Sequence, residues 1–205
     1  MCDTGHAHDH DRFGFLVDTP EVRHVIDQAH RQLASVADYA DRIEALKPAF
    51  AQLLEADGWL PETFAGPDEK SRMGDGIGQY ALYRAEDGSL CLFSLVIPAG
   101  AETPVHDHLA WGLVGVYRGD QSETVYRRLD DGSKPGYAEV ELQKEFLNEP
   151  GHAAVFAVGD MHSIEYGDDT FFIRVTGGDV ESKKTLRFDL EKKSVQVADR
   201  AQGQR

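Results

Sequence analysis

Two histidines separated by one residue are the strongest chemical signal in this sequence. The segment Pro104-Val-His106-Asp-His108 lies between two stretches with the pattern of β-strands. Because side chains on an extended chain alternate between faces, His106 and His108 point to the same side. Neutral imidazoles on one face suit a shared iron, zinc, copper or nickel ion. The pair alone is a weak signal, and surface histidines on a loop are the alternative.

A third histidine strengthens the metal-site interpretation. The segment Gly159-Asp-Met-His162 places a histidine at the start of a later strand, directly after a tight turn. In a double-stranded β-helix, such a turn brings a late strand beside an early one. His162 is therefore the expected third ligand, and His152, in a Pro-Gly turn, is the alternative.

The elements that must position these histidines fall into three parts. A chain of 205 residues predicts one domain with a small helical appendage. Residues 1–18 lack a periodic pattern and are expected to form a flexible N-terminal tail, with an accessory metal-binding tail built on His6, His8 and His10 as the alternative. Residues 19–76 are predicted to be a helical lead-in, and residues 77–205 an all-β domain.

Helix signals dominate the lead-in. Thr19-Pro20-Glu21 is typical of a helix start, with a cap residue, a proline in the first turn and an acid. A second helical pattern runs from about Asp38 to Ala56, and Pro48 is expected to split it or to begin a new helix. Residues 61–76 have the composition of a loop.

The pattern changes at residue 77 to short apolar or alternating runs separated by turn residues. Many short strands with regular turn signals are typical of a sandwich or barrel, and short turns favour antiparallel pairing. The expected strands are residues 77–84, 89–97, 111–118, 122–129, 137–147, 153–157, 162–166, 170–176, 185–190 and 194–197.

Composition excludes several classes of function. The 21 basic and 36 acidic residues give a net charge of −15, which disfavours nucleic acid and anionic membranes as partners. No apolar run is long enough to span a bilayer, and the N-terminus lacks the pattern of a signal peptide. Cys2 and Cys91 form no disulfide framework, so we expect a cytoplasmic protein.

The sequence resembles the cupin superfamily and, within it, the bacterial thiol dioxygenases that act on cysteine or 3-mercaptopropionate. The resemblance spans roughly residues 40–180 and includes the helical lead-in that ends at Asp57-Gly58-Trp59-Leu60-Pro61. It implies a mainly β fold, a cupin double-stranded β-helix (jelly-roll barrel) preceded by an N-terminal helical segment. The matching motifs are Gly100-Ala-Glu-Thr-Pro-Val-His106-Asp-His108-Leu-Ala-Trp111-Gly112, Gly115 to Gly119, Gly159-Asp-Met-His162 and Arg174-Val-Thr-Gly177-Gly178-Asp179.

The resemblance implies that His106, His108 and His162 bind Fe(II), although a three-histidine site accepts other divalent metals. The implied partners are O2 and a small thiol, expected to carry a carboxylate, and the implied product is a sulfinate. Asp107 is expected to point away from the metal and to orient a neighbour or meet solvent. Glu123 comes too late to match the spacing of a fourth cupin ligand.

One strand departs from the family. The family carries a Ser-His-Tyr relay where this sequence has Phe172, Arg174 and Thr176, so neither the relay chemistry nor the cysteine–tyrosine cross-link of the animal enzymes is possible. These three side chains share one face of the strand, opposite Phe171, Ile173 and Val175. Facing the metal, Arg174 would offer a bidentate fork for a carboxylate, whereas on the outer face it would pair with an acid.

Three further residues are candidates for the pocket. Gln79 and Arg84 lie on the strand where the family contacts the substrate carboxylate, and ordinary strand positions are the alternative. Trp111 matches a tryptophan of the family and either walls the pocket or packs in the core.

These observations favour a non-haem Fe(II) dioxygenase for a small thiol, acting as a monomer or homodimer. Because the relay is missing, another metal-dependent cupin enzyme, such as a lyase or isomerase on a small acid, stays possible. A non-catalytic cupin that binds a metal or ligand is the third hypothesis.

Overall fold

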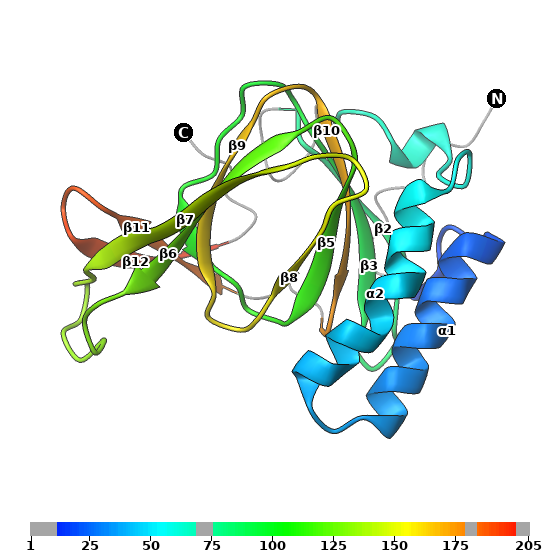
Figure 1. Cartoon of the computed structure of the whole chain (residues 1–205), viewed down its shortest axis with the longest axis horizontal. Helices are drawn as coiled ribbons and strands as arrows, with labels where there is room; N and C mark the ends of the chain where they lie inside the picture. Colours follow the sequence, from blue (N-terminus) through cyan, green and yellow to red (C-terminus); the bar gives the residue numbers. More distant parts are fainter. Residues whose placement is uncertain (1–11, 69–75, 179–183, 200–205) are drawn as a thin grey trace.

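Two helices followed by two facing β-sheets form the molecule (Figure 1). The computed structural model describes residues 12–68, 76–178 and 184–199. The chain is therefore mainly β with an N-terminal helical segment, as the sequence predicts. None of its described helices combines the length and the apolar character needed to cross a membrane.

The helices start where their caps predict. The Thr19 hydroxyl accepts from the amide of Val22 at the start of α1 (Pro20–Ser35), and the Asp38 carboxylate accepts from the amide of Ala40 at the start of α2 (Tyr39–Glu55). The expected split at Pro48 is wrong, because α2 continues through it. Pro48 lies on the exposed side of the helix, where water can bond the carbonyl that loses its amide partner. A short 3-10 helix, η2 (Glu62–Phe64), lies in the segment expected to be loop.

Each sheet has six antiparallel strands. The first sheet has the order β1 (Gly14–Phe15), β2 (Gly78–Arg84), β3 (Cys91–Ile97), β10 (Thr170–Thr176), β5 (Gly112–Arg118), β8 (Ala153–Phe156). The second has the order β12 (Ser194–Asp199), β11 (Lys184–Asp189), β4 (Val105–Asp107), β9 (Met161–Tyr166), β6 (Gln121–Arg128), β7 (Val140–Asn148).

The pairing of these strands is nested. Strand β3 pairs with β10, β4 with β9, β5 with β8, and β6 with β7. Early strands therefore lie beside late ones, in alternate sheets, as in a double-stranded β-helix. The predicted double-stranded β-helix, a jelly-roll topology, is confirmed by this pairing.

Part of the segment expected to be a flexible N-terminal tail has a defined structure. Gly14 and Phe15 pair with Arg84 and Tyr83, and Val17 is only 2% exposed. This inner part of the 1–18 segment belongs to the fold because it extends the first sheet at its edge. The histidines at positions 6, 8 and 10 lie outside the described residues.

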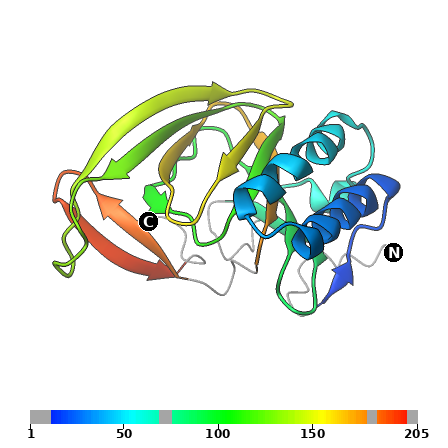
Figure 2. The ribbon, with the colours of Figure 1, turned by 60° about the horizontal axis from the view of Figure 1, so that its bottom comes forward.

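The first sheet separates two apolar layers. Its outer face packs against the helices, with Leu113, Ile173 and Val175 in the same cluster as Phe50 of α2 (Figure 1). Its inner face carries Phe172, in a second cluster between the sheets. The predicted alternation along residues 170–176 is therefore confirmed. The β6–β7 and β11–β12 hairpins project on the side away from the helices (Figure 2).

Candidate metal centre

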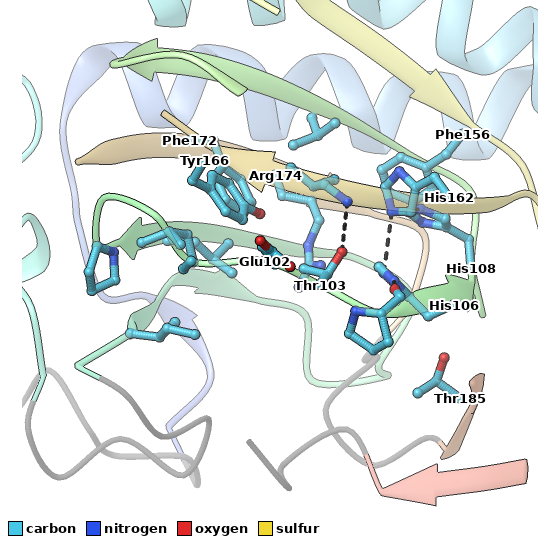
Figure 3. Close-up of a pocket in the computed structure, with 18 of the residues that line it drawn as sticks. Glu102, Thr103, His106, His108, Phe156, His162, Tyr166, Phe172, Arg174 and Thr185 are labelled. Atoms are coloured by element: carbon cyan, nitrogen blue, oxygen red, sulfur yellow. Dashed lines mark hydrogen bonds between the residues drawn. The ribbon is translucent and has the colours of Figure 1, made fainter. Parts of the chain in front are cut away.

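Three histidine side chains meet between the two sheets (Figure 3). His106 on β4 is the cross-strand partner of His162 on β9, and His108 directly follows β4. The Nε2 atom of His162 lies 2.9 Å from Nε2 of His108 and 3.2 Å from Nε2 of His106. The structure thus brings together the three predicted ligands, and the ligand atoms of all three lie within 4.8 Å of one another.

Hydrogen bonds set the tautomers of two of these rings. Nδ1 of His106 lies 2.9 Å from the carbonyl oxygen of Pro104, and Nδ1 of His162 lies 2.6 Å from Oε1 of Glu123. Both oxygens accept, so each Nδ1 carries the proton and each Nε2 presents a lone pair. In their neutral forms, His106 and His162 therefore aim two acceptors at each other, which a cation between them would stabilise.

The separations suit a divalent first-row ion. Metal–nitrogen bonds of about 2.0–2.1 Å, at ligand angles of about 90–109°, place two nitrogens roughly 2.8–3.4 Å apart. The 2.9 Å and 3.2 Å separations fall in that range. Three imidazoles suit iron, zinc, copper or nickel, so the donor set fits a metal without selecting one.

A buried carboxylate lies behind His162. Glu123 on β6 is 7% exposed, and its second oxygen accepts from Nδ2 of Asn148 at 2.9 Å. Burial raises the pKa of Glu123, but the hydrogen bonds from His162 and Asn148 outweigh it and hold that pKa below its usual value. Glu123 is thus an ionised group that orients a ligand, a role that sequence reasoning missed.

The histidines open into a cavity of about 440 Å³ between the sheets. This volume is within the range of small-molecule sites. Most of the lining is apolar, with Leu95, Val114, Phe156 and Ile164 among its walls. Besides the histidines, the polar and charged residues of the lining are Glu102, Thr103, Tyr166, Arg174, Thr185 and Arg187.

Arg174 and Phe172 project from β10 into this cavity (Figure 3). Arg174 is 6% exposed, and its guanidinium carbon lies 5.6 Å from the centre of the Phe93 ring. The Phe172 ring stacks on Tyr166 at 6.2 Å between centres. Burial raises the pKa of Tyr166, so its hydroxyl keeps its proton at neutral pH and can donate. A carboxylate could be held by Arg174 in the same space that the histidines face.

Four of the residues expected in the pocket do not line the cavity: Gln79, Arg84, Trp111 and Thr176. Arg84 is 5% exposed, and its guanidinium carbon lies 5.5 Å from the Phe93 ring. Gln79 on β2 is the cross-strand partner of Leu95 on β3. The Thr176 hydroxyl donates to the carbonyl of Gly178 at 2.9 Å.

Trp111 is partly buried and packs against the apolar cluster between the first sheet and the helices. Its ring covers Gly177, where an added Cβ would lie 2.0 Å from the ring. His152 is exposed just before β8, with its ring centre 6.4 Å from that of Phe146, and is not part of the histidine cluster.

Asp107, the last residue of β4, lies between His106 and His108 and contacts the neighbouring strand. Its Oδ1 accepts from the Thr185 hydroxyl at 2.9 Å and from the amide of Leu186 at 2.7 Å. As alternation predicts, the carboxylate turns from the metal site toward a neighbour. It fixes β11 against β4.

No protein family model matches the chain. Solved structures similar to it include an acetylacetone dioxygenase from Acinetobacter johnsonii, with 16% identity, a TM-score of 0.41, and coverage of 69% of this chain and 78% of that one. An RmlC-like cupin protein from Ralstonia eutropha has 14% identity, a TM-score of 0.41, and coverage of 66% and 73%. A cupin superfamily protein from Desulfitobacterium hafniense has 12% identity, a TM-score of 0.37, and coverage of 50% and 78%. The nested strand pairing of this chain establishes its jelly-roll topology.

Proposed function

We propose that this protein is a non-haem Fe(II) dioxygenase that adds both atoms of O2 to the sulfur of a small thiol carboxylate. The reaction consumes one thiol and one O2 and yields one sulfinic acid, which loses its proton to give the sulfinate. The observation that carries this proposal is that the three-histidine cluster and Arg174 share one mostly apolar cavity.

The charge of the donor set favours an anionic substrate. The candidate ligands His106, His108 and His162 are neutral when they bind a metal, so they leave its positive charge uncompensated. When bound, Fe(II) supplies a Lewis acid that lowers the pKa of the thiol and a redox-active centre for O2. The histidines fix where this chemistry takes place.

Arg174 positions the substrate. Its guanidinium can bind a carboxylate through two parallel hydrogen bonds, and a carboxylate held there directs the rest of a small molecule toward the histidines. Apolar side chains such as Val114, Phe156 and Ile164 exclude water from the space between. The protonated Tyr166 hydroxyl lies in the same cavity as a hydrogen-bond donor.

The side chains of β10 are also compatible with a second candidate function, a metal-dependent lyase or isomerase. Phe172 and Arg174 line the cavity on the strand where the resembling family has its relay, and neither offers relay chemistry. A metal-dependent lyase or isomerase acting on a small acid would use the same histidines and Arg174 without O2.

Oxygen uptake tests the proposal. Protein loaded anaerobically with Fe(II) is mixed with air-saturated buffer and cysteine, cysteamine, 3-mercaptopropionate or mercaptosuccinate. We expect one O2 consumed per thiol, with both oxygen atoms of labelled O2 in the sulfinate by mass spectrometry. Cysteamine, which lacks a carboxylate, should be the poorest substrate.

The His162→Ala variant is the matched control, because it removes a ligand and leaves Arg174 in place. Uptake that is equal in this variant would contradict the proposed site. Absence of uptake with every thiol, in protein that retains iron, would overturn the dioxygenase and favour the lyase, the isomerase or a non-catalytic metal-binding cupin.

A further inference from the structure

We propose that the substrate carries an apolar group, comparable in size to a benzyl group, that fills the end of the cavity away from the histidines. The inference rests on the proposed function, which places the thiol at the metal centre. It names the substrate class of that same site as thiol carboxylates with a bulky apolar substituent. The extent and the lining of the cavity lead to it.

The cavity extends along two strands of facing sheets. His162 and Tyr166 are four residues apart on β9, and both line the cavity. Residues at this spacing lie on the same face of a strand, with their Cα atoms about 13 Å apart. On the other sheet, the lining continues along β10 from Arg174 to Phe172. In Figure 3, Tyr166 and Phe172 lie together on the far side of Arg174 from the histidines.

The end of the cavity away from the histidines has apolar walls. Its lining residues belong to one apolar cluster between the sheets, and we call them the apolar end: Ile77, Leu95, Ile97, Ala101, Tyr166 and Phe172. The rings of Tyr166 and Phe172 are almost parallel, with an angle of 5° and centres 6.2 Å apart. Walls built from aliphatic side chains and aromatic rings favour an apolar or aromatic ligand group.

Backbone hydrogen bonds hold the walls of the apolar end in place. The amide of Tyr166 donates to the carbonyl of Ala101 at 3.0 Å, and the amide of Gly100 donates to the carbonyl of Tyr166 at 2.8 Å. Phe172 on β10 is the cross-strand partner of Leu95 on β3. A space with walls fixed in this way can receive a ligand group without rearrangement of the backbone, which lowers the free-energy cost of binding.

The volume of the cavity exceeds what a three-carbon thiol acid fills. A volume of about 440 Å³ corresponds to roughly fifteen water molecules at about 30 Å³ each. 3-Mercaptopropionate bound at the histidines would displace only a minority of them. The remaining water would lie against apolar walls, where it forms few hydrogen bonds, so its replacement by an apolar group is favourable. The apolar end therefore favours a substrate larger than the simplest thiol acids.

Binding to a redox-inert form separates this inference from turnover. Zn(II)-loaded protein is titrated anaerobically by calorimetry with 3-mercaptopropionate and with each enantiomer of 2-benzyl-3-mercaptopropionate, which has the same thiol and carboxylate. We expect at least one enantiomer to bind about tenfold to a hundredfold more tightly, the gain that burial of a phenyl ring gives. Its binding should also have a more negative heat capacity change, since it buries more apolar surface.

Two variants fill the apolar end from different walls. Ala101→Leu adds bulk beside Tyr166, and Ile77→Phe adds it from the segment just before β2; both positions are only partly buried. We expect each variant to weaken binding of the benzyl compound about tenfold or more and to leave 3-mercaptopropionate within about twofold. Ala34→Leu, the same substitution as at Ala101 but on the exposed surface of α1, is the matched control and should change neither affinity.

The outcomes distinguish the two proposals. The inference would be overturned if neither benzyl enantiomer bound more tightly than 3-mercaptopropionate, or if every filled variant that folds bound the benzyl compound normally. If the Fe(II) protein still oxidised 3-mercaptopropionate in that case, the proposed function would stand. If the benzyl compound bound with the expected dependence on Ala101 and Ile77 but no thiol led to O2 uptake, the inference would stand and the dioxygenase would fail.

Discussion

Oε1 of Glu123 lies 2.6 Å from Nδ1 of His162, on the edge of the ring opposite the nitrogen that faces the other histidines. Asn148 donates to the second carboxylate oxygen and so holds Glu123 in place. A carboxylate in this position keeps the proton on Nδ1 and makes Nε2 a stronger ligand. The chain from Asn148 through Glu123 to His162 therefore prepares one ligand before a metal binds.

Replacing this carboxylate should weaken metal binding. We expect Glu123→Gln to lower the affinity for Zn(II) or Co(II) about tenfold to a hundredfold, because a neutral amide no longer enforces the tautomer. Competition with a chelator measures the affinity. Glu141→Gln, in an exposed ion pair with Arg127, is the control. Unchanged affinity in Glu123→Gln would contradict a role in orienting His162.

The three histidines should be required together. We expect His106→Ala, His108→Ala and His162→Ala each to abolish stoichiometric metal, because two imidazoles and water bind a divalent ion far more weakly than three. His152→Ala should retain one metal per chain, since His152 is exposed and outside the cluster. Elemental analysis after dialysis distinguishes these results. Retained metal in the His162 variant would show that the third ligand is elsewhere.

Strand faces could be predicted from the sequence, but strand neighbours could not. The alternation along residues 170–176 indicates that Ile173 and Arg174 lie on opposite faces, and the structure places Ile173 beneath the helices and Arg174 in the cavity. A period of two carries no information on which strand lies beside β10. Only the resemblance or the structure could identify which strands pair with each other.

The metal ligands could be predicted because two of them, His106 and His108, lie two residues apart in the sequence. Glu123 and Arg187 could not, because each reaches the site only through strand pairing, β6 with β9 and β11 with β4. Sequence reasoning excluded Glu123 as a ligand on its spacing and had no means of detecting a hydrogen bond to His162. For Glu123, the only sign in the sequence was its position within the expected strand 122–129.

A tight contact at Gly112 should connect core packing to the metal site. An added Cβ would lie 2.4 Å from Cζ of Phe156 and 2.4 Å from the carbonyl oxygen of Val175. The Phe156 ring in turn lies 4.0 Å from the His108 ring, measured between centres. We expect Gly112→Ala to lower the free energy of unfolding by about 1–3 kcal/mol, as overpacking does, and to weaken metal binding by moving Phe156 against His108.

Urea unfolding of the metal-free protein and chelator competition measure the two effects of Gly112→Ala separately. Gly66→Ala is the matched control, because an added Cβ there meets no atom within 4 Å. A Gly112→Ala protein with reduced stability but unchanged metal affinity would show that Phe156 does not transmit the displacement to His108.

Asp130 should give the β6–β7 hairpin a pH-dependent contribution to stability. Its carboxylate accepts two hydrogen bonds from Arg128, at 2.9 Å and 2.8 Å, and others from the amides of Glu139 and Gly132. The Arg128 guanidinium and these amides hold the pKa of Asp130 well below its usual value. A carboxyl whose pKa is lower in the folded state stabilises the protein above its unfolded pKa of about 3.9, and that stabilisation is lost as pH falls below it.

We therefore expect Asp130→Asn to lower the Tm of the metal-free protein by an amount that is constant between about pH 5 and 7 and shrinks below about pH 4. Below that pH the carboxyl of the unfolded chain binds a proton that the folded carboxylate does not, so the carboxylate loses its advantage over the amide. Thermal unfolding of both proteins across this range measures the difference. Glu44→Gln, which removes an exposed pair with Lys47 on α2, should change Tm little at any pH. A difference for Asp130→Asn that persists unchanged at the lowest pH would mean that shape, and not the charge of the carboxylate, accounts for its contribution.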